Sequence, residues 1–217
     1  MWFFFTNMAS TYYIDTFINS LKEKFPKEHS IPLAHQLMMP QGRIMVPDHS
    51  NPPLKSAVLL LLFPKQGQLY FPIIRRPVYD GMHSGQMALP GGKQEEIDVT
   101  LEQTAVREAC EEIGICSSDI RILGHLTELY IAVTNIHVLP VVALAIQEPS
   151  FVLDAREVDE LFSIPLTDLL NPELKKKELW DLRGQQVEVP FYLLANHKVW
   201  GATAMILSEF ESIAKGL

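Results

Sequence analysis

Residues 83–115 read HSGQMALPGGKQEEIDVTLEQTAVREACEEIGI. On a helix over the second half of this stretch, Glu108, Glu111 and Glu112 stand at i, i+3 and i+4, so their carboxylates share one face. Like charges at this spacing cost about 0.2–0.5 kcal/mol per pair on an exposed helix. A divalent cation removes that repulsion, because hard Mg²⁺ and Mn²⁺ prefer carboxylate oxygen. The pattern therefore favours a metal-binding helix face, and the alternative is a solvated acidic surface.

The opposite face of the same segment is apolar. Its apolar side chains recur every three to four residues; they are Ala105, Val106, Ala109 and Ile113. Asp98 and Thr100 are both suitable N-caps, and Gly114 stands where a helix ends in a left-handed residue. We predict a short amphipathic helix, buried on one side and anionic on the other.

A family pattern covers this segment. The run Pro90-Gly91-Gly92, followed at a fixed distance by REACEEIGI over residues 107–115, resembles the Nudix box, Gly-x5-Glu-x7-Arg-Glu-apolar-x-Glu-Glu-x-Gly-apolar. Residues 107–115 match every specified position. Upstream, Asp98 stands where the pattern has Glu, and eight residues instead of seven separate it from Arg107. This longer, Asp-containing form resembles the coenzyme A pyrophosphatase branch of the Nudix superfamily.

The flanking sequence also resembles that branch. It has the arginine-rich lead-in IIRR over residues 73–76 and the glycine-rich approach HSGQMALPGG over residues 83–92. Three positions depart from the branch: Pro77 replaces a small residue, Gly81 an arginine, and Leu89 a phenylalanine.

The resemblance implies a fold and a reaction. The fold is α/β, a Nudix-type α/β/α sandwich with a mixed β-sheet. The reaction is hydrolysis of a nucleoside diphosphate-linked compound with Mg²⁺ or Mn²⁺, most closely coenzyme A or acyl-CoA cleaved to 3′,5′-ADP and (acyl-)4′-phosphopantetheine. The alternatives are another nucleotide derivative, such as NADH, ADP-ribose or a sugar nucleotide, and a non-catalytic Nudix-like binding module. The module is disfavoured because all three box glutamates are present.

The resemblance also implies roles for individual residues. Glu108 and Glu112 are expected to bind the metal, and Glu111 is expected to be a further ligand or to position the attacking water. Arg107 is expected to orient these carboxylates through a bidentate contact. The residues expected to bind the substrate are Arg75, Arg76, His83, Gly91 and Gly92.

Two further acidic residues lie downstream of the box. Residues 154–162, DAREVDELF, resemble a segment that follows the box in this family. Either Glu157 or Glu160 is an additional carboxylate at the metal, or both are surface acids, the reading that we favour. The run Lys175-Lys176-Lys177 is expected to be a solvated loop.

Composition limits the class of protein. With 217 residues, 47% of them apolar and 20% charged, the chain is predicted to fold as one soluble domain over 51–217, with an N-terminal helix and lead-in over 1–50. The net charge of −8 disfavours nucleic acid as a partner, and no apolar run is long enough to span a membrane. We expect Cys110 and Cys116 to be structural thiols in a reducing cytoplasm. A homodimer is left open.

Periodicity and turn residues predict the remaining elements. Pro140 indicates a bulge or a sheet edge, and the turn at residues 64–67 indicates a hairpin. Strands are predicted over residues 55–63, 68–75, 120–130, 137–146, 187–194 and 197–200, and helices over 12–25 and 203–213.

Overall fold

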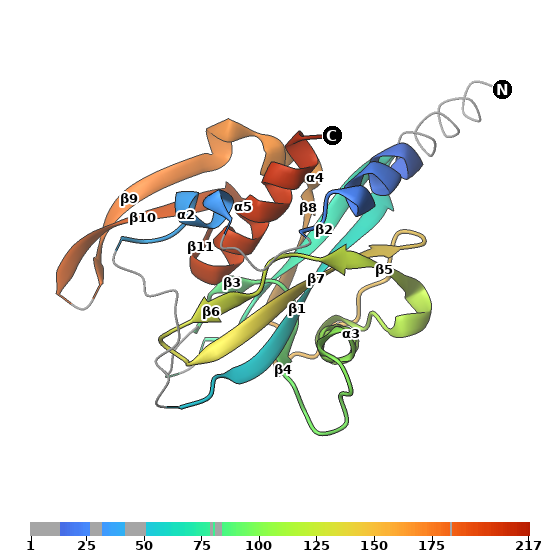
Figure 1. Cartoon of the computed structure of the whole chain (residues 1–217), viewed down its shortest axis with the longest axis horizontal. Helices are drawn as coiled ribbons and strands as arrows, with labels where there is room; N and C mark the ends of the chain where they lie inside the picture. The colour runs from blue at the N-terminus through green and yellow to red at the C-terminus, as the bar shows by residue number, and fades with distance from the viewer. Residues whose placement is uncertain (1–13, 27–31, 42–50, 79, 81–83, 183) are drawn as a thin grey trace.

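The structure is a computed structural model of the whole chain (Figure 1). It describes residues 14–26, 32–41, 51–78, 80, 84–182 and 184–217. The predicted substrate residue His83 lies outside the described residues, as does Gly81.

A mixed sheet forms the centre of the molecule. The sheet has eight strands, and its main path runs β3-β2-β1-β7-β5. Strand β1 pairs parallel with β7 and antiparallel with β2, so the sheet is mixed. The strands are β1 (Leu54–Lys65), β2 (Gln68–Arg75), β3 (Met87–Ala88), β4 (Gly91–Lys93), β5 (Ile120–His125), β6 (Leu129–Ile131), β7 (Ile136–Ala145) and β8 (Glu160–Pro165). The predicted hairpin is confirmed, with left-handed Gln66 and Gly67 at its turn.

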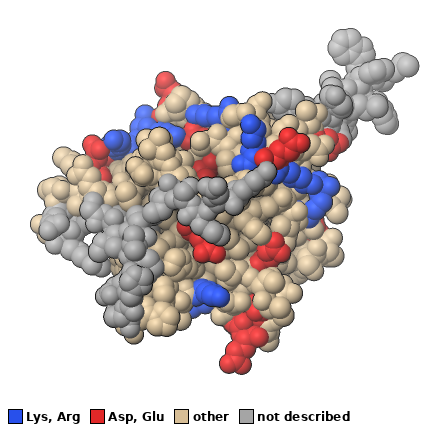
Figure 2. Space-filling view, in the orientation of Figure 1, with Lys and Arg blue, Asp and Glu red and all other residues tan. Residues whose placement is uncertain are grey.

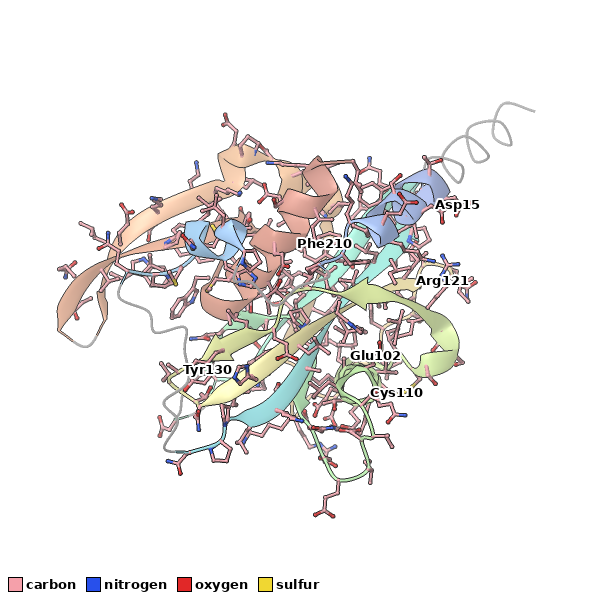
Figure 3. The ribbon with its side chains drawn as sticks, in the orientation of Figure 1. Asp15, Glu102, Cys110, Arg121, Tyr130 and Phe210 are labelled. Carbon is pink, nitrogen blue, oxygen red and sulfur yellow. A yellow bond between two sulfur atoms is a disulfide. The ribbon has the colours of Figure 1, made fainter. Side chains whose placement is uncertain are left out.

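Helices cover both faces of this sheet. Leu60 and Leu62 of β1 belong to a core cluster that includes residues of α5 (Gly201–Lys215), among them Phe210. Leu59 and Leu61 belong to a second cluster, which includes Ala105 and Ala109 of α3 (Leu101–Ile113). Alternate residues of β1 therefore face opposite cores. Figure 1 shows α3 and α5 on opposite sides of the sheet, and Figure 3 labels Phe210 on α5, so the predicted fold class is confirmed.

Pro140 lies in the interior of the sheet. Strand β7 pairs with β1 on one side and with β5 and β6 on the other, and the bulge falls in β5, between Ile122 and Gly124. The expectation of a bulge or sheet edge at Pro140 is therefore wrong. Pro140 stands between Val141, which pairs with β5, and Val138, which pairs with β6. The partner of β7 changes from β6 to β5 at Pro140, so the N–H that proline lacks is not needed for strand pairing there.

A second sheet precedes the C-terminal helix. It has three strands in the order β11-β10-β9, namely β9 (Lys175–Leu182), β10 (Gln185–Leu194) and β11 (His197–Trp200). Lys175, Lys176 and Lys177 belong to β9, so the predicted solvated loop is wrong. The registry with β10 supplies the backbone partners that a loop would lack. The ammonium of Lys175 lies 5.4 Å from the ring centre of Tyr192, so its aliphatic stem covers an aromatic face.

The N-terminal part packs on the same core. Residues 14–23 are helical, and Ile18 and Leu21 are buried in the cluster that contains α5. The short helix α2 (Leu33–Leu37) packs on α5, and α4 (Leu166–Leu170) follows β8. The division of the chain at residue 50 stays a prediction. Within the described residues, no helix combines the length and apolarity needed to cross a membrane. On the face shown in Figure 2, acidic and basic side chains are interspersed with uncharged surface.

The two cysteines are joined. Gly114 turns the chain back over the last turn of α3, which brings the Cα atoms of Cys110 and Cys116 to 4.5 Å in a disulfide. The expectation that both remain thiols is therefore wrong in this structure.

Candidate metal centre and active site

Both ends of the glutamate-bearing helix α3 are fixed by local sequence. Thr100 is the N-cap, and it forms a capping box with Gln103: each side chain bonds the other residue's backbone N–H. At the other end Gly114 has a φ of 74°, and its N–H bonds the carbonyl of Cys110. These two signals set where the helix begins and ends, and its buried apolar face, with Ala105 and Ala109, turns the carboxylates to the other side.

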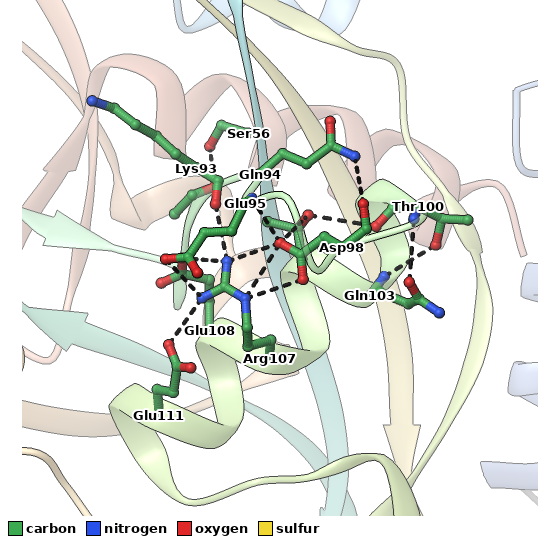
Figure 4. Close-up of polar contacts among 12 residues, drawn as sticks. Ser56, Lys93, Gln94, Glu95, Asp98, Thr100, Gln103, Arg107, Glu108 and Glu111 are labelled. Carbon is green, nitrogen blue, oxygen red and sulfur yellow. Dashed lines mark hydrogen bonds and ion pairs between the residues drawn. The ribbon is translucent and has the colours of Figure 1, made fainter.

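Asp98, the second candidate cap, binds Arg107 instead (Figure 4). The Nε of Arg107 donates to Oδ1 of Asp98 over 3.1 Å, and a terminal nitrogen donates to Oδ2 over 3.0 Å. Asp98 also accepts from the hydroxyl of Thr104 and the backbone N–H of Glu95. The hydrogen bond from Arg107 is the main cause that lowers the pKa of Asp98 to about 2. The aspartate that departs from the Nudix pattern thus holds the box arginine.

Arg107 connects this aspartate to the box glutamates. Its guanidinium lies 3.0 Å from Oε1 of Glu108 and donates to Oε2 of Glu111 over 2.9 Å. It also donates to the carbonyl of Lys93, at the end of β4. The predicted bidentate contact of Arg107 is therefore made to Asp98, while the glutamates receive single contacts.

The Gly91-Gly92 loop brings backbone against the same glutamates. Gly91 has a φ of 152°, and a side chain there would overlap the carbonyl of Ala57. A side chain at Gly92 would overlap the carboxylate of Glu108. The N–H of Gly91 donates to Oε2 of Glu112 over 2.9 Å. Two adjacent glycines are therefore needed for β4 to approach the carboxylates.

Three carboxylates converge beside this loop. Oxygens of Glu108, Glu112 and Glu157 lie within 4.8 Å of one another. Burial is the main cause that raises the pKa of Glu112 to about 7, and Glu108 and Glu157 raise it further; the N–H of Gly91 and the charge of Arg76 oppose the rise. Burial also raises the pKa of Glu108. Hard oxygen donors crowded at this distance fit Mg²⁺ or Mn²⁺, because a cation replaces mutual repulsion with coordination.

Glu157 reaches the cluster from a neighbouring segment. Residues 152–158 dock on the end of α3, where the N–H of Asp154 donates to the carbonyl of Glu112. The prediction that Glu157 is a surface acid is not what this geometry favours, and only its position in DAREVDELF indicated the alternative. Glu160 does not join the cluster: its carboxylate lies 2.8 Å from a terminal nitrogen of Arg75.

Glu111 points away from the cluster. Its side chain is 54% exposed and pairs with Arg107, whereas Glu112 is 3% exposed. The predicted role of Glu111 as a ligand or as the residue that positions water stays a prediction.

The two candidate phosphate-binding arginines have different surroundings. The Nε of Arg75 donates to Asp159 over 2.8 Å, and its guanidinium also pairs with Glu160. Arg76 donates to the carbonyl of Gly91 over 3.3 Å and faces Glu112. Arg76 is thus beside the cluster, and the substrate contacts predicted for both arginines, Gly91 and Gly92 remain predictions.

Fold and site together define a class of protein. An α/β/α sandwich with glutamates of one helix gathered beside a Gly-Gly loop is the arrangement that the Nudix box implies. The NUDIX domain family matches this chain over residues 53–183, and the chain belongs to that family. It is a Nudix hydrolase, an enzyme that acts on a nucleotide derivative.

Two relatives agree with this assignment, and one solved structure shares the fold. A protein of Photorhabdus laumondii named "Uncharacterized Nudix hydrolase NudL" is 32% identical over 176 residues, 80% of this chain and 90% of the relative. A NudL protein of Yersinia pestis is 36% identical over 137 residues, 62% and 67% of the two chains. The MutT protein of Methanosarcina mazei Go1 superposes with a TM-score of 0.51 at 19% identity, covering 78% of this chain and 98% of that chain. This last likeness concerns the fold alone.

Proposed function

We propose that this Nudix hydrolase cleaves coenzyme A or an acyl-CoA at its diphosphate, giving 3′,5′-ADP and (acyl-)4′-phosphopantetheine, with Mg²⁺ or Mn²⁺. The observation that carries the chemistry is the convergence of Glu108, Glu112 and Glu157 beside Gly91-Gly92. The choice of substrate is supported by the Asp98-containing form of the box and by the IIRR lead-in over residues 73–76.

The proposed centre assigns a task to each residue. Glu108, Glu112 and Glu157 would hold the cation. A bound divalent cation neutralises phosphate charge and lowers the pKa of water. The N–H of Gly91 fixes the rotamer of Glu112. Asp98 fixes the guanidinium of Arg107, and Arg107 in turn holds Glu108 and Glu111 in position.

The substrate side of the proposal rests on Arg76. Among the described residues, its guanidinium makes one hydrogen bond, to the carbonyl of Gly91 at 3.3 Å. Other donors of its planar group can therefore meet a phosphate oxygen near the cluster. Gly91 and Gly92 would offer backbone groups beside the cluster to a bound diphosphate.

A substrate panel tests the proposal. Purified protein is incubated with coenzyme A, acetyl-CoA, NADH, ADP-ribose and a sugar nucleotide, each with Mg²⁺ or Mn²⁺, and the products are identified by mass. We expect 3′,5′-ADP from the first two compounds and little turnover of the others. Turnover of NADH or ADP-ribose with coenzyme A untouched would refute coenzyme A as the substrate, while the assignment as a Nudix hydrolase would stand. No Mn²⁺ binding by calorimetry would favour a binding module instead.

Location and assembly remain predictions. A cytoplasmic location was predicted from two free thiols. The Cys110–Cys116 disulfide disfavours it, because disulfides are rare in a reducing compartment. Mass spectrometry of the protein taken from cells under alkylating conditions measures the oxidised fraction. Light scattering measures whether the proposed homodimer forms.

A further inference from the structure

The segment that carries Glu157 is held at both ends. At its start, the N–H groups of Val152 and Asp154 donate to the carbonyls of Ile113 and Glu112 over 3.0 and 3.1 Å. These are carbonyls of the last turn of α3, which have no partner within the helix. The segment thus begins on the same helix that supplies two of the clustered carboxylates.

The middle of the segment is one tight turn. The N–H groups of Glu157 and Val158 both bond the carbonyl of Asp154, at 3.0 and 2.9 Å. Val158 is 2% exposed and packs in the core cluster that contains α3. Glu157 itself is exposed, and the backbone of this turn places its side chain beside the cluster. Its position depends on where the turn is anchored.

The far end of the segment is held by Arg75. The N–H of Asp159 donates to the carbonyl of Arg75 over 2.9 Å. The Nε of Arg75 donates to Asp159, and a terminal nitrogen pairs with Glu160, each at 2.8 Å. One planar guanidinium therefore bridges two consecutive acids directly after the Glu157 turn.

We propose that Arg75 is a positioning residue that acts through Glu157, keeping this carboxylate within reach of Glu108 and Glu112, and that it does not bind substrate. The inference rests on the proposed metal centre and goes beyond it. Arg76, its sequence neighbour, faces Glu112 and the Gly91 carbonyl, so the two adjacent arginines divide positioning from substrate contact.

The direction of one effect separates positioning from plain electrostatics. Arg75→Gln removes a positive charge near a cation site and unpairs Asp159 and Glu160. By charge alone, both changes would tighten Mn²⁺ binding. Loss of positioning weakens it, because Glu157 is no longer held near the other two carboxylates. Removing a residue that holds a metal ligand typically lowers metal affinity about 10–100-fold. The ion pairs of Arg75 with Asp159 and Glu160 are partly exposed, so we expect a loss of about three- to tenfold.

The experiment is a double-mutant cycle read by calorimetric Mn²⁺ binding to the full chain. Arg75→Gln should raise the Kd for Mn²⁺ about three- to tenfold. Arg75→Lys should give an intermediate Kd, because one ammonium group cannot pair with two carboxylates as the planar guanidinium does. In a Glu157→Gln background, Arg75→Gln should change the Kd less than about twofold. Arg121→Gln, on an exposed position of β5, is the matched control and should bind Mn²⁺ normally.

Several outcomes overturn the proposal. It fails if Arg75→Gln leaves the Kd unchanged or lowers it, or if its effect is equally large in the Glu157→Gln background. It also fails if Arg75→Gln raises only the KM for substrate, which would make Arg75 a phosphate ligand. An unchanged Kd in Glu112→Gln would refute the metal centre and this inference together. Turnover of a nucleotide other than coenzyme A would refute the substrate while this inference stands.

Discussion

Two groups of carboxylates lie on either side of Arg107, and they have opposite electrostatics. Asp98 is enclosed by donors from Arg107, Thr104 and Glu95, and its pKa is lowered to about 2. Glu112 is also buried, and burial is the main cause that raises its pKa to about 7, with two neighbouring carboxylates raising it further. One group is complete within the protein, whereas the other is satisfied only when a proton or a cation is added.

This difference separates a structural carboxylate, just before α3, from the candidate functional carboxylates on that helix. A carboxylate whose oxygens are all bonded stabilises the fold and has nothing left for a ligand. A crowded, buried carboxylate with a raised pKa costs stability, and such costs gather at functional sites. Carboxylates of the same stretch therefore do two jobs: Asp98 is saturated by its donors, whereas Glu112 lies among other carboxylates.

The largest expected effect is on turnover. Glu112→Gln should lower hydrolysis by about two to four orders of magnitude, because it removes one of the clustered oxygens. The variant should stay folded, since a glutamine oxygen can still accept from the N–H of Gly91. Steady-state assays and a thermal melt measure both. Glu173→Gln, on the exposed η2 turn (Pro172–Leu174), is the control. Near-native turnover by Glu112→Gln would contradict the site.

The next effect is on stability. Asp98→Asn removes the bidentate partner of Arg107, which keeps its contacts with Glu108 and Glu111, and should lower the free energy of unfolding by about 1–3 kcal/mol. Urea unfolding of the metal-free protein measures it. An unfolding midpoint equal to that of the native protein would show that the two carboxylate groups do not differ as described.

The pH dependence of the metal-free protein sharpens the comparison. The folded state raises the pKa of Glu112 from 4.5 to about 7, so it retains a proton that the unfolded chain loses, and stability falls as pH rises through that window. Relative to the native protein, Glu112→Gln should gain about 2–3 kcal/mol between pH 4.5 and pH 7.

Asp98 should behave in the opposite sense. Its pKa falls from 3.8 to about 2, so its contribution is complete above pH 4 and is lost as pH drops toward 2. Asp98→Asn should therefore differ from the native protein by a constant amount above pH 4 and by less below it. Denaturant titrations in a chelator measure both variants. If stability depended on pH in the same way in the native protein and in Glu112→Gln, the proposed difference between Asp98 and Glu112 would be contradicted.

The smallest expected effect compares two exposed glutamates. Glu157→Gln should weaken Mn²⁺ binding about tenfold, whereas Glu111→Gln, which loses only its contact with Arg107, should change it by less than about threefold. Calorimetric titration of the two variants side by side measures this. A larger loss of Mn²⁺ affinity in Glu111→Gln than in Glu157→Gln would indicate that Glu111 is a metal ligand and Glu157 a surface acid.

Local patterns predicted much of this molecule because their signals are short in range. The apolar run of Leu59 to Leu62, the turn at Gln66-Gly67 and the glycine cap of α3 are each visible within a few residues. The run of three lysines was misjudged because its strand depends on pairing with residues 190–192 of β10, which lie 13 to 17 residues further on. The six-residue spacing of the cysteines gave no sign that Gly114 would return Cys116 to Cys110.

The amino-acid sequence alone determined the helix with three glutamates, the glycine loop and, through their spacing, the family. Only the tertiary structure decided which acid does what: Asp98 holds Arg107, Glu111 faces outward, and Glu157 joins Glu108 and Glu112. The reason is physical. Spacing along a chain fixes which side chains share a helix face, whereas the pKa and partners of a carboxylate depend on segments that packing brings together from distant parts of the chain.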